Sequence, residues 1–332
     1  MRASLFALAL VLAAPAAAQQ QDFSTVEIKV ERLAPGVAVL FGSGGNIGLS
    51  YGGDGNVIVD DQFAPLTDKI AAAIAALDPD PVRFVINTHW HFDHTGGNEN
   101  FGRGGAVILA HDNVRARMST EQFIAALKLK VPPSPSGALP VVTFGEGVTL
   151  HINGDTLHVV HVANAHTDGD SLVHWAKADV LHMGDTFFHG ASFPFIDLSS
   201  GGSIDGVIAA AGKGLEMAGP NTRIIPGHGP VATRKDLAAY RDMLVDIRGK
   251  VAAAIAAKRT LEQVKASAPA ARYGMADGFI KPDQFIETVY ESLRNPPKKT
   301  PPHSHGGESH SHGIRGGYSP NTRAKIVSTC LR

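Results

Sequence analysis

Short apolar runs separated by polar turns fill most of the chain, and their spacing predicts a mixed α/β fold. The clearest run, residues 82–87, is bounded by a proline and a polar cluster, as is typical of a buried strand. Before it, residues 70–77 have the spacing of a helix that stops at Asp78 and Pro79. A strand over residues 55–61, this helix and the run at 82–87 therefore predict a crossover unit with two parallel strands.

The same pattern extends over the rest of the chain. A turn at residues 153–155 joins two alternating runs and predicts a hairpin. Prolines exclude regular helix and central strand from residues 131–137, which we expect to form a surface loop and a wall of the substrate cleft. The other predicted strands are residues 25–30, 37–41, 107–110, 141–144, 148–152, 156–162, 171–175, 179–183 and 222–225, and the other predicted helices are residues 111–130, 203–218, 235–258, 261–266 and 285–293.

The densest cluster of histidine and aspartate side chains follows the predicted strand at residues 82–87. The loop T-H-W-H-F-D-H-T-G-G carries His89, His91, Asp93 and His94 within six residues. Neutral imidazoles and carboxylates together suit a divalent transition metal, zinc most often. Four donors this close can hardly all face one ion, so two neighbouring metals are the simpler interpretation. A single histidine in a loop would not indicate a metal, but this spacing at a strand end does.

Three more candidate donors lie at later strand ends. His166 follows the predicted hairpin, Asp185 follows the strand at residues 179–183, and His228 stands between two glycines after the last predicted strand. Loops mounted on the ends of strands are where sites are usually placed. The three residues therefore join the loop at residues 88–97 as candidate metal ligands.

Other polar and aromatic residues have more than one interpretation. Asp60, at the end of a predicted strand, can either orient a ligand histidine or cap the next helix, and both readings stay open. His111 is assigned to a helix start or to the surface. The aromatic rings of residues 187–197 are expected to divide about equally between core and cleft. We interpret three further histidines as strand side chains that do not bind metal: His151, His158 and His161.

The ordered series of the H-x-H-x-D-H loop, His166, Asp185 and His228 resembles the signature of the metallo-β-lactamase superfamily. The resemblance covers nearly all of residues 24–293. It implies an α/β fold, a four-layer αβ/βα sandwich, with the site where its two halves meet. It also implies two Zn²⁺ ions per chain, which Asp185 would bridge as in glyoxalase-like relatives. Carried over by position, it assigns His89, His91 and His166 to the first ion and Asp93, His94 and His228 to the second.

The resemblance also implies an activity. A dinuclear zinc hydrolase of this kind uses a metal-bridging hydroxide to attack a carboxylic-acid derivative, here a lactam, lactone, ester or thioester. Asp93 would orient that nucleophile and is the candidate catalytic carboxylate. A β-lactamase activity stays open, although Asp185 stands where the best-known lactamases have a cysteine or serine. That difference counts modestly against a dedicated lactamase.

Two other functions fit parts of the sequence. Some members of the superfamily hold iron with the same ligands, so an iron-dependent oxidoreductase such as a sulfur dioxygenase is one alternative. A periplasmic zinc-binding protein is another, because a histidine-rich segment occupies residues 296–332. Its composition is that of a disordered tail. The histidines in question are His303, His305, His310 and His312.

Composition narrows the class of partner. The chain has 332 residues, of which 44% are hydrophobic and 18% charged, and its formal net charge is -1. This balance gives no electrostatic reason to expect nucleic acid as a partner. We expect one hydrolase domain over residues 19–295 that acts on a small molecule. The substrate and the oligomeric state stay open.

The first residues predict export. Arg2 precedes an apolar run at residues 5–12 and a small-residue segment that ends at Ala18, which is typical of a signal peptide cleaved after residue 18. The run is too short to span a bilayer comfortably, so we expect a periplasmic or secreted protein with no stable membrane insertion after cleavage. Cys330 is the only cysteine, so no internal disulfide accompanies export.

Overall fold

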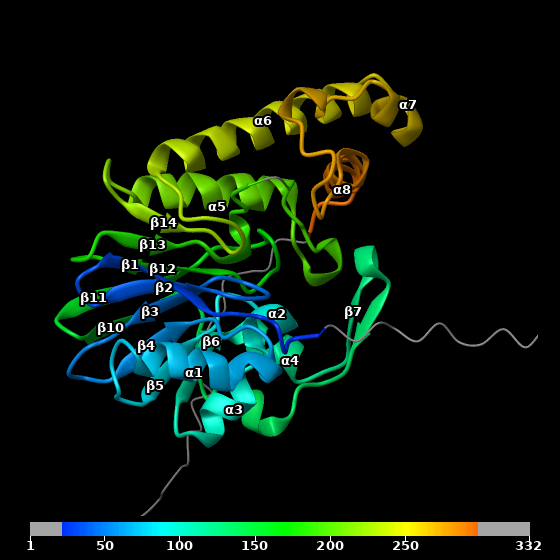
Figure 1. The fold of residues 1–332 in the computed structure, drawn as a ribbon. Helices are drawn as coiled ribbons and strands as arrows, with labels where there is room; N and C mark the ends of the chain where they lie inside the picture. The colour runs from blue at the N-terminus through cyan, green and yellow to red at the C-terminus, as the bar shows by residue number, and fades with distance from the viewer. Residues whose placement is uncertain (1–21, 191, 298–332) are drawn as a thin grey trace, which may run out of the picture. The chain divides into compact units, whose positions relative to one another are not determined.

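Two β-sheets face each other across an apolar interior, and helices cover their outer faces (Figure 1). The computed structural model describes residues 22–190 and 192–297. The expected signal peptide, residues 1–18, and nearly all of the expected tail, residues 296–332, lie outside the described residues. Within the described residues, none of the helices has both the length and the apolar character needed to cross a membrane. The predicted four-layer αβ/βα sandwich is confirmed.

The first sheet has seven strands in the described residues, in the order β1-β2-β3-β4-β5-β6-β9. The strands from β1 to β4 pair antiparallel, whereas β4, β5, β6 and β9 pair parallel. Because helix α1 connects β4 to β5, the predicted parallel crossover unit is confirmed. The strands are β1 Lys29–Ala34, β2 Val37–Phe41, β3 Ile47–Ser50, β4 Asn56–Val59, β5 Val82–Ile86, β6 Val107–His111 and β9 Val142–Phe144.

The second sheet has five strands in the same part of the chain, in the order β10-β11-β12-β13-β14. Its strands pair antiparallel except for β13 and β14, which are parallel. The predicted hairpin joins β10 to β11, and Asn153 and Gly154 adopt the positive φ angles that its tight turn requires. The strands are β10 Gly147–Ile152, β11 Asp155–His161, β12 Ser171–Trp175, β13 Val180–His182 and β14 Arg223–Ile225.

Helices form the two outer layers. Helices α1 and α3 lie on the first sheet, α5 lies on the second sheet, and α6 and α8 pack on α5 (Figure 1). Ser203 caps α5 as expected, because its hydroxyl accepts a hydrogen bond from the Gly206 N–H. The helices are α1 Thr67–Ala75, α2 Phe92–Thr95, α3 Asn98–Arg103, α4 Asp112–Met118, α5 Ile204–Met217, α6 Arg234–Ala256, α7 Leu261–Ala266 and α8 Pro282–Arg294. Short 3-10 helices are η1 Ala64–Leu66, η2 Ala125–Leu127, η3 Ser136–Ala138, η4 Gly184–Thr186, η5 Leu198–Ser200 and η6 Ala271–Tyr273.

The layers follow from the alternation of side chains along each strand. In β4, Val57 and Val59 are buried between the sheets, whereas Ile58 packs among the residues under α1. In β14, Ile225 faces the other sheet and Ile224 faces the helices. Trp175 is fully buried between the sheets. Both faces of β4 and β14 are therefore apolar, which makes them continuous apolar runs in the sequence.

Residues 111–130 do not form the single helix that was predicted. Helix α4 ends at Met118, and an antiparallel hairpin follows, with β7 Gln122–Ile124 and β8 Leu129–Val131 on either side of η2. Phe123 is 52% exposed and Ile124 is buried, which is strand alternation in a segment whose composition also fits a helix. Lys128 adopts a left-handed conformation, and this interrupts any helix through the segment.

One smaller prediction is also corrected, and the predicted surface loop at residues 131–137 is largely exposed as expected. The first strand begins at Lys29 rather than residue 25, because the backbone carbonyls of Phe23, Ser24 and Val26 accept hydrogen bonds from Lys69 Nζ instead of joining a sheet. The proline-rich segment packs against α3 through η3, where the Ala138 carbonyl accepts a hydrogen bond from Asn98 Nδ2.

His111 ends β6 and caps α4, since its Nδ1 atom accepts a hydrogen bond from the Asn113 N–H. The predicted helix-start role is thus confirmed, and the surface alternative is wrong because the residue is 2% exposed. Its ring stacks on His161 with centroids 3.8 Å apart. Burial and the neighbouring His161 lower the pKa of His111 to about 4.

We expect His111 to make folding depend on pH in one window. Between pH about 6.5 and about 4 the unfolded chain binds a proton at this residue and the folded chain does not, so stability falls as the pH falls. The variant His111→Asn keeps a capping side chain and does not titrate. Denaturant unfolding from pH 7 to 4 should show a pH slope smaller by up to one proton per molecule than in the wild type. An identical slope would contradict the expected protonation.

Candidate metal centre

Loops from both sheets meet at one end of the sandwich, and they carry all the candidate donors. The loop at residues 88–97 follows β5 of the first sheet. His166, Asp185 and His228 follow β11, β13 and β14 of the second sheet. Because each loop starts at the carboxyl end of its strand, the donors converge where the two sheets meet.

Two groups of donor atoms result. Within each group, the ligand atoms lie within 4.8 Å of one another. The first group is fully buried, and the second opens partly to solvent, with His228 32% exposed at its side chain. The structure therefore brings together all seven residues that the sequence singles out, and their role as ligands stays a prediction. The first group is His89, His91, His166 and Asp185, and the second is Asp93, His94 and His228.

The Asp185 carboxylate lies between the two groups. Its Oδ1 atom is 3.1 Å from His94 Nε2 and 3.4 Å from His228 Nε2. Its Oδ2 atom is 3.6 Å from His166 Nε2. Gly227 lets this carboxylate approach, since a Cβ there would lie 2.0 Å from Asp185 Oδ1. One oxygen thus faces each group, which is the geometry that the predicted bridging role requires.

Hydrogen bonds behind the rings fix the orientation of the buried histidines. His89 Nδ1 lies 3.0 Å from Thr88 Oγ1, and His166 Nδ1 lies 2.8 Å from the Phe195 carbonyl oxygen. His91 instead uses Nε2, which lies 3.1 Å from Asp197 Oδ2. Each acceptor takes the ring N–H and leaves the other nitrogen directed into the group.

Asp60 orients the site rather than capping a helix. Its carboxylate accepts hydrogen bonds from the Thr88 N–H and hydroxyl, both at 2.7 Å, and lies 2.7 Å from His94 Nδ1. The residue holds an unusual φ of 65° for a non-glycine, and it is fully buried. Asp60 therefore supports His94 directly and His89 through Thr88.

Asp197 is a positioning residue that the sequence pattern did not reveal. Besides His91, its carboxylate accepts hydrogen bonds from the backbone N–H and the hydroxyl of Ser199 and of Ser200. Burial alone would raise the pKa of Asp197, but the bonds from His91 and the serines outweigh it and hold the pKa well below its ordinary value. The D-x-S-S pattern at residues 197–200 was the available signal, but it resembles any helix cap.

The buried atoms of the first group fit a cation. His89 Nε2 is buried without a hydrogen-bond partner, and His91 Nδ1 lies only 2.8 Å from His166 Nε2. Since both of these nitrogens belong to rings whose other N–H is already donated, they are two acceptors facing each other. A buried unpaired acceptor is unfavourable, and a cation between such atoms removes the penalty.

Protonation in the first group suits a metal. Burial and the imidazole of His94 lower the pKa of His89 well below its ordinary value, and burial lowers that of His166 to about 4. Burial opposes ionisation of Asp185, but the imidazoles of His94, His228 and His166 outweigh it and hold its pKa well below the usual range. Neutral imidazoles and ionised carboxylates are the forms that bind divalent metals.

The second group differs in its protonation. Burial opposes protonation of His94 and His228, but the neighbouring carboxylates, chiefly Asp185, outweigh it and raise the pKa of His94 well above its ordinary value and that of His228 to about 9. A divalent cation in the second group would displace these ring protons.

An apolar cleft opens beside the second group. It has a volume of about 560 Å³ and reaches Asp93, His228 and Asp185. The proline-rich loop was predicted to form a wall of this cleft, but no residue of 131–140 lines it. The β7–β8 hairpin lines the cleft instead, through Ile124 and Leu127. The aromatic segment divides as expected, with Phe187 and Phe193 fully buried in the core and Phe188 and Phe195 lining the cleft.

Comparison with known proteins decides the family. The sequence profile described as Metallo-beta-lactamase superfamily matches residues 40–268, which is more than half of the chain. The chain belongs to this superfamily. Curated relatives match over shorter stretches. A "Hydroxyacylglutathione hydrolase" of Anaeromyxobacter dehalogenans is 34% identical over 131 residues, covering 37% of this chain and 49% of the relative.

Other relatives carry different names. The "2,4-dinitroanisole O-demethylase subunit alpha" of a Nocardioides species is 29% identical over 118 residues, which are 35% of this chain and 32% of the relative. The "Acyl-coenzyme A thioesterase MBLAC2" of Gallus gallus is 23% identical over 210 residues, or 56% of this chain and 73% of the relative. The chain thus spans 32% of the demethylase subunit and 49% of the hydroxyacylglutathione hydrolase, which is half or less of each. The superfamily relatives include proteins named as hydrolases and thioesterases.

Solved structures support the fold. A metallo-beta-lactamase from Pontibacter korlensis superposes with a TM-score of 0.54 at 18% identity, covering 66% of this chain and 100% of that protein. The sec-alkylsulfatase Pisa1 from Pseudomonas superposes with a TM-score of 0.61 at 16% identity, covering 80% of this chain and 50% of that protein. At these identities the likeness concerns architecture alone.

We expect Asp197→Asn to weaken metal binding. Asparagine keeps the helix-capping oxygen but removes the charge that orients the His91 ring, and loss of such a partner typically lowers metal affinity about 10- to 100-fold. Competition with a chelator for Zn²⁺ measures the change. The control is Asp205→Asn, which removes an exposed carboxylate paired with Arg248 and should leave the affinity unchanged. Equal affinities in the two variants would contradict the positioning role.

Proposed function

We propose that this protein is a dinuclear zinc hydrolase that cleaves a carboxylic-acid derivative: a lactam, lactone, ester or thioester. The observation that carries the proposal is the pair of donor groups that share the Asp185 carboxylate at the end of an apolar cleft. The buried nitrogens of the first group and the carboxylates of both groups are the donor types that zinc prefers.

The residues divide into two holding sets. His89, His91 and His166 would hold the first cation, and Asp93, His94 and His228 the second. Bound divalent cations acidify water and polarise a carbonyl group. His91 and His228 also line the cleft, so a substrate in the cleft would reach both sets.

Asp93 has a second task in this proposal. Its side chain is 22% exposed and lines the cleft, and its Oδ2 atom lies 3.3 Å from His228 Nε2. Burial alone would raise the pKa of Asp93, but His94 and His228 outweigh it and keep the pKa below its usual value. An ionised carboxylate at the edge of the cleft can orient the attacking water, accept its proton and return it to the leaving group.

Metal analysis and turnover test the proposal together. Protein purified without an affinity tag and reloaded with Zn²⁺ should contain two zinc ions per chain and hydrolyse at least one member of a panel of lactams, lactones, esters and thioesters. Asp93→Ala should lower the rate about 10²- to 10⁴-fold through loss of the proton acceptor and a ligand. His89→Ala should remove metal from the first set, whereas His158→Ala, an exposed strand histidine, is the control.

Each contrary result has a defined meaning. Full metal-dependent activity in the Asp93→Ala or His89→Ala protein would end the hydrolase proposal. Iron in place of zinc, together with oxygen consumption in the presence of a persulfide, would favour the sulfur dioxygenase. Loss of zinc delivery without loss of turnover on deletion of residues 296–332 would favour a role for that segment in zinc binding.

We also propose that the protein is exported to the periplasm or beyond the cell. The support is the signal-like sequence at residues 1–18, which lie outside the described residues. Expressed with its leader, the protein should appear in the periplasmic or secreted fraction with Gln19 as its first residue, as read by mass spectrometry of the intact chain. A cytoplasmic protein that retains Met1 or Arg2 would contradict export.

A further inference from the structure

The cleft beside the donor groups is lined mainly by apolar side chains. Its lining includes seven large apolar side chains, from five different parts of the fold. The carboxylates of Asp93 and Asp185 and the imidazoles of His91 and His228 that reach it belong to the candidate metal centre, and none of the described residues that line it is a lysine or an arginine. The apolar residues are Phe63, Phe92, Ile124, Leu127, Phe188, Phe195 and Phe279.

Three of these side chains are unusually exposed at the mouth of the cleft. Phe279 is 65% exposed, Leu127 41% and Phe92 37%. Large apolar side chains that gather on a surface mark a place where apolar matter binds. They come from the segment before α8, from the η2 turn of the hairpin and from the start of α2, so they gather only because the fold brings these loops together.

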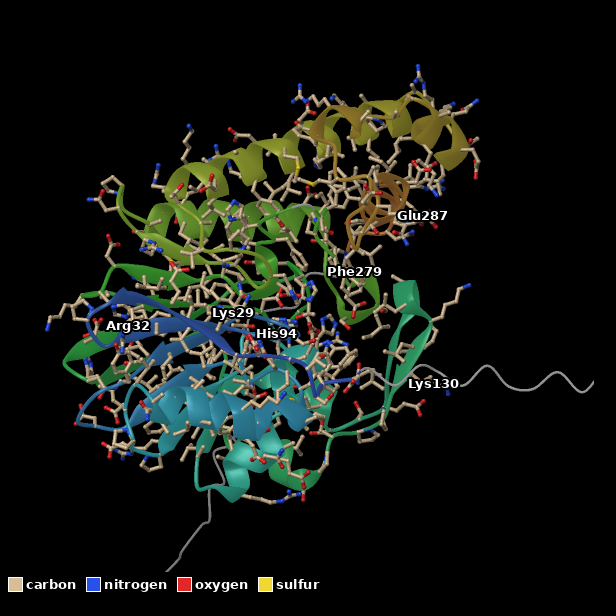
Figure 2. All side chains as sticks on the ribbon, viewed as in Figure 1. Lys29, Arg32, His94, Lys130, Phe279 and Glu287 are labelled. Carbon is tan, nitrogen blue, oxygen red and sulfur yellow. The ribbon has the colours of Figure 1, made fainter. Side chains whose placement is uncertain are left out.

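A second hollow of about 370 Å³ adjoins the cleft and shares lining residues with it. Leu127, Phe195 and Phe279 line both spaces, and the second one runs past η5 to α8. Figure 2 shows Phe279 before α8 and Glu287 on that helix. Asp197, Glu287 and Glu291 line this hollow as well, and none of its described lining residues is a lysine or an arginine. A substrate group in this hollow would meet apolar walls and carboxylates.

This distribution of charge discriminates between substrates. An anionic group that lies away from the donor atoms, in the second hollow, would find no lysine, arginine or histidine among the described lining residues and would lose its hydration without a partner. A neutral hydrocarbon or aromatic group would instead release water from seven apolar side chains. Lactams with a free carboxylate, glutathione thioesters and coenzyme A thioesters all carry negative charge away from the scissile bond.

We propose that the substrate is an uncharged ester, lactone or thioester with a hydrophobic group of several carbon atoms. That group lies against Leu127, Phe195 and Phe279, while the scissile carbonyl group lies at the donor atoms. This inference rests on the proposed hydrolase function and narrows its substrate class. Such a substrate differs from the acylglutathione that the name of the hydroxyacylglutathione hydrolase relative gives as the substrate of that protein.

Chain length and charge of the substrate test the inference in the zinc-loaded protein. Across 4-nitrophenyl acetate, butanoate, hexanoate and octanoate, kcat/KM should rise by up to about fourfold for each methylene that becomes buried. The matched pair is 4-nitrophenyl hexanoate and the mono-4-nitrophenyl ester of hexanedioic acid, in which a carboxylate replaces the terminal methyl group. The neutral ester should be favoured at least about tenfold. Equal or better turnover of the anionic ester would overturn the inference.

Variants locate the effect in the cleft. Phe279→Ala and Leu127→Ala should each reduce the preference for octanoate over acetate, mainly through a higher KM for octanoate. The control is Phe123→Ala, which removes a ring that is 52% exposed on the same hairpin but does not line the cleft. An unchanged chain-length preference in both cleft variants, or an equal change in the control, would overturn the assignment.

A binding measurement separates this inference from the hydrolase proposal. The neutral fluorescent probe N-phenyl-1-naphthylamine should bind the zinc-loaded protein, more weakly after Phe279→Ala but not after Phe123→Ala. If the probe binds in this way and no panel substrate is hydrolysed, the hydrolase proposal fails and the apolar cleft stands. If esters are hydrolysed with no preference for length or neutrality, only the substrate inference fails. If neither binding nor hydrolysis occurs, both fail.

Discussion

The buried contact between His91 Nδ1 and His166 Nε2, at 2.8 Å, is the constraint on which the rest of the centre depends. Each ring already donates its other N–H, one to Asp197 and one to the Phe195 carbonyl, so two lone pairs face each other away from water. That arrangement is stable only with a positive charge between the rings. The neighbouring unpaired His89 Nε2 extends the same requirement to a third ring.

The two sheets hold the loops that carry these histidines in a fixed position. Strand β4 ends in Asp60, whose carboxylate binds Thr88 at the end of β5, so the first sheet fixes the histidine loop from behind. Asn46, which directly precedes β3 of the first sheet, donates hydrogen bonds to the Pro226 and Gly229 carbonyls. These bonds hold the His228 loop of the second sheet. Asp61 accepts a hydrogen bond from the Gly97 N–H at the end of the histidine loop, and burial raises the pKa of its carboxyl group well above the usual value. The apolar interior between the sheets provides the rigidity that keeps these loops in place.

Much of this architecture could be predicted because its signals are local. Strand β5 is a short apolar run with clear boundaries, and the loop of candidate metal ligands follows it directly. The predicted strand and the predicted ligands therefore support each other. The later donors also stand directly after strands. Asp197 could not be found in this way, because its partner His91 lies 106 residues earlier and its own neighbours look like a helix cap. The β7–β8 hairpin was missed because its apolar positions fit a helix and a strand alike, and tertiary packing of Ile124 decided between them. The cleft depends on both of these segments, so its apolar character appears only in three dimensions.

Anomalous diffraction at the zinc edge, from crystals of the untagged protein loaded with Zn²⁺, tests the central claim most directly. The account predicts two anomalous peaks on either side of the Asp185 carboxylate. One should lie among His89, His91 and His166, and the other among Asp93, His94 and His228. A single peak, or peaks bound away from Asp185, would contradict it.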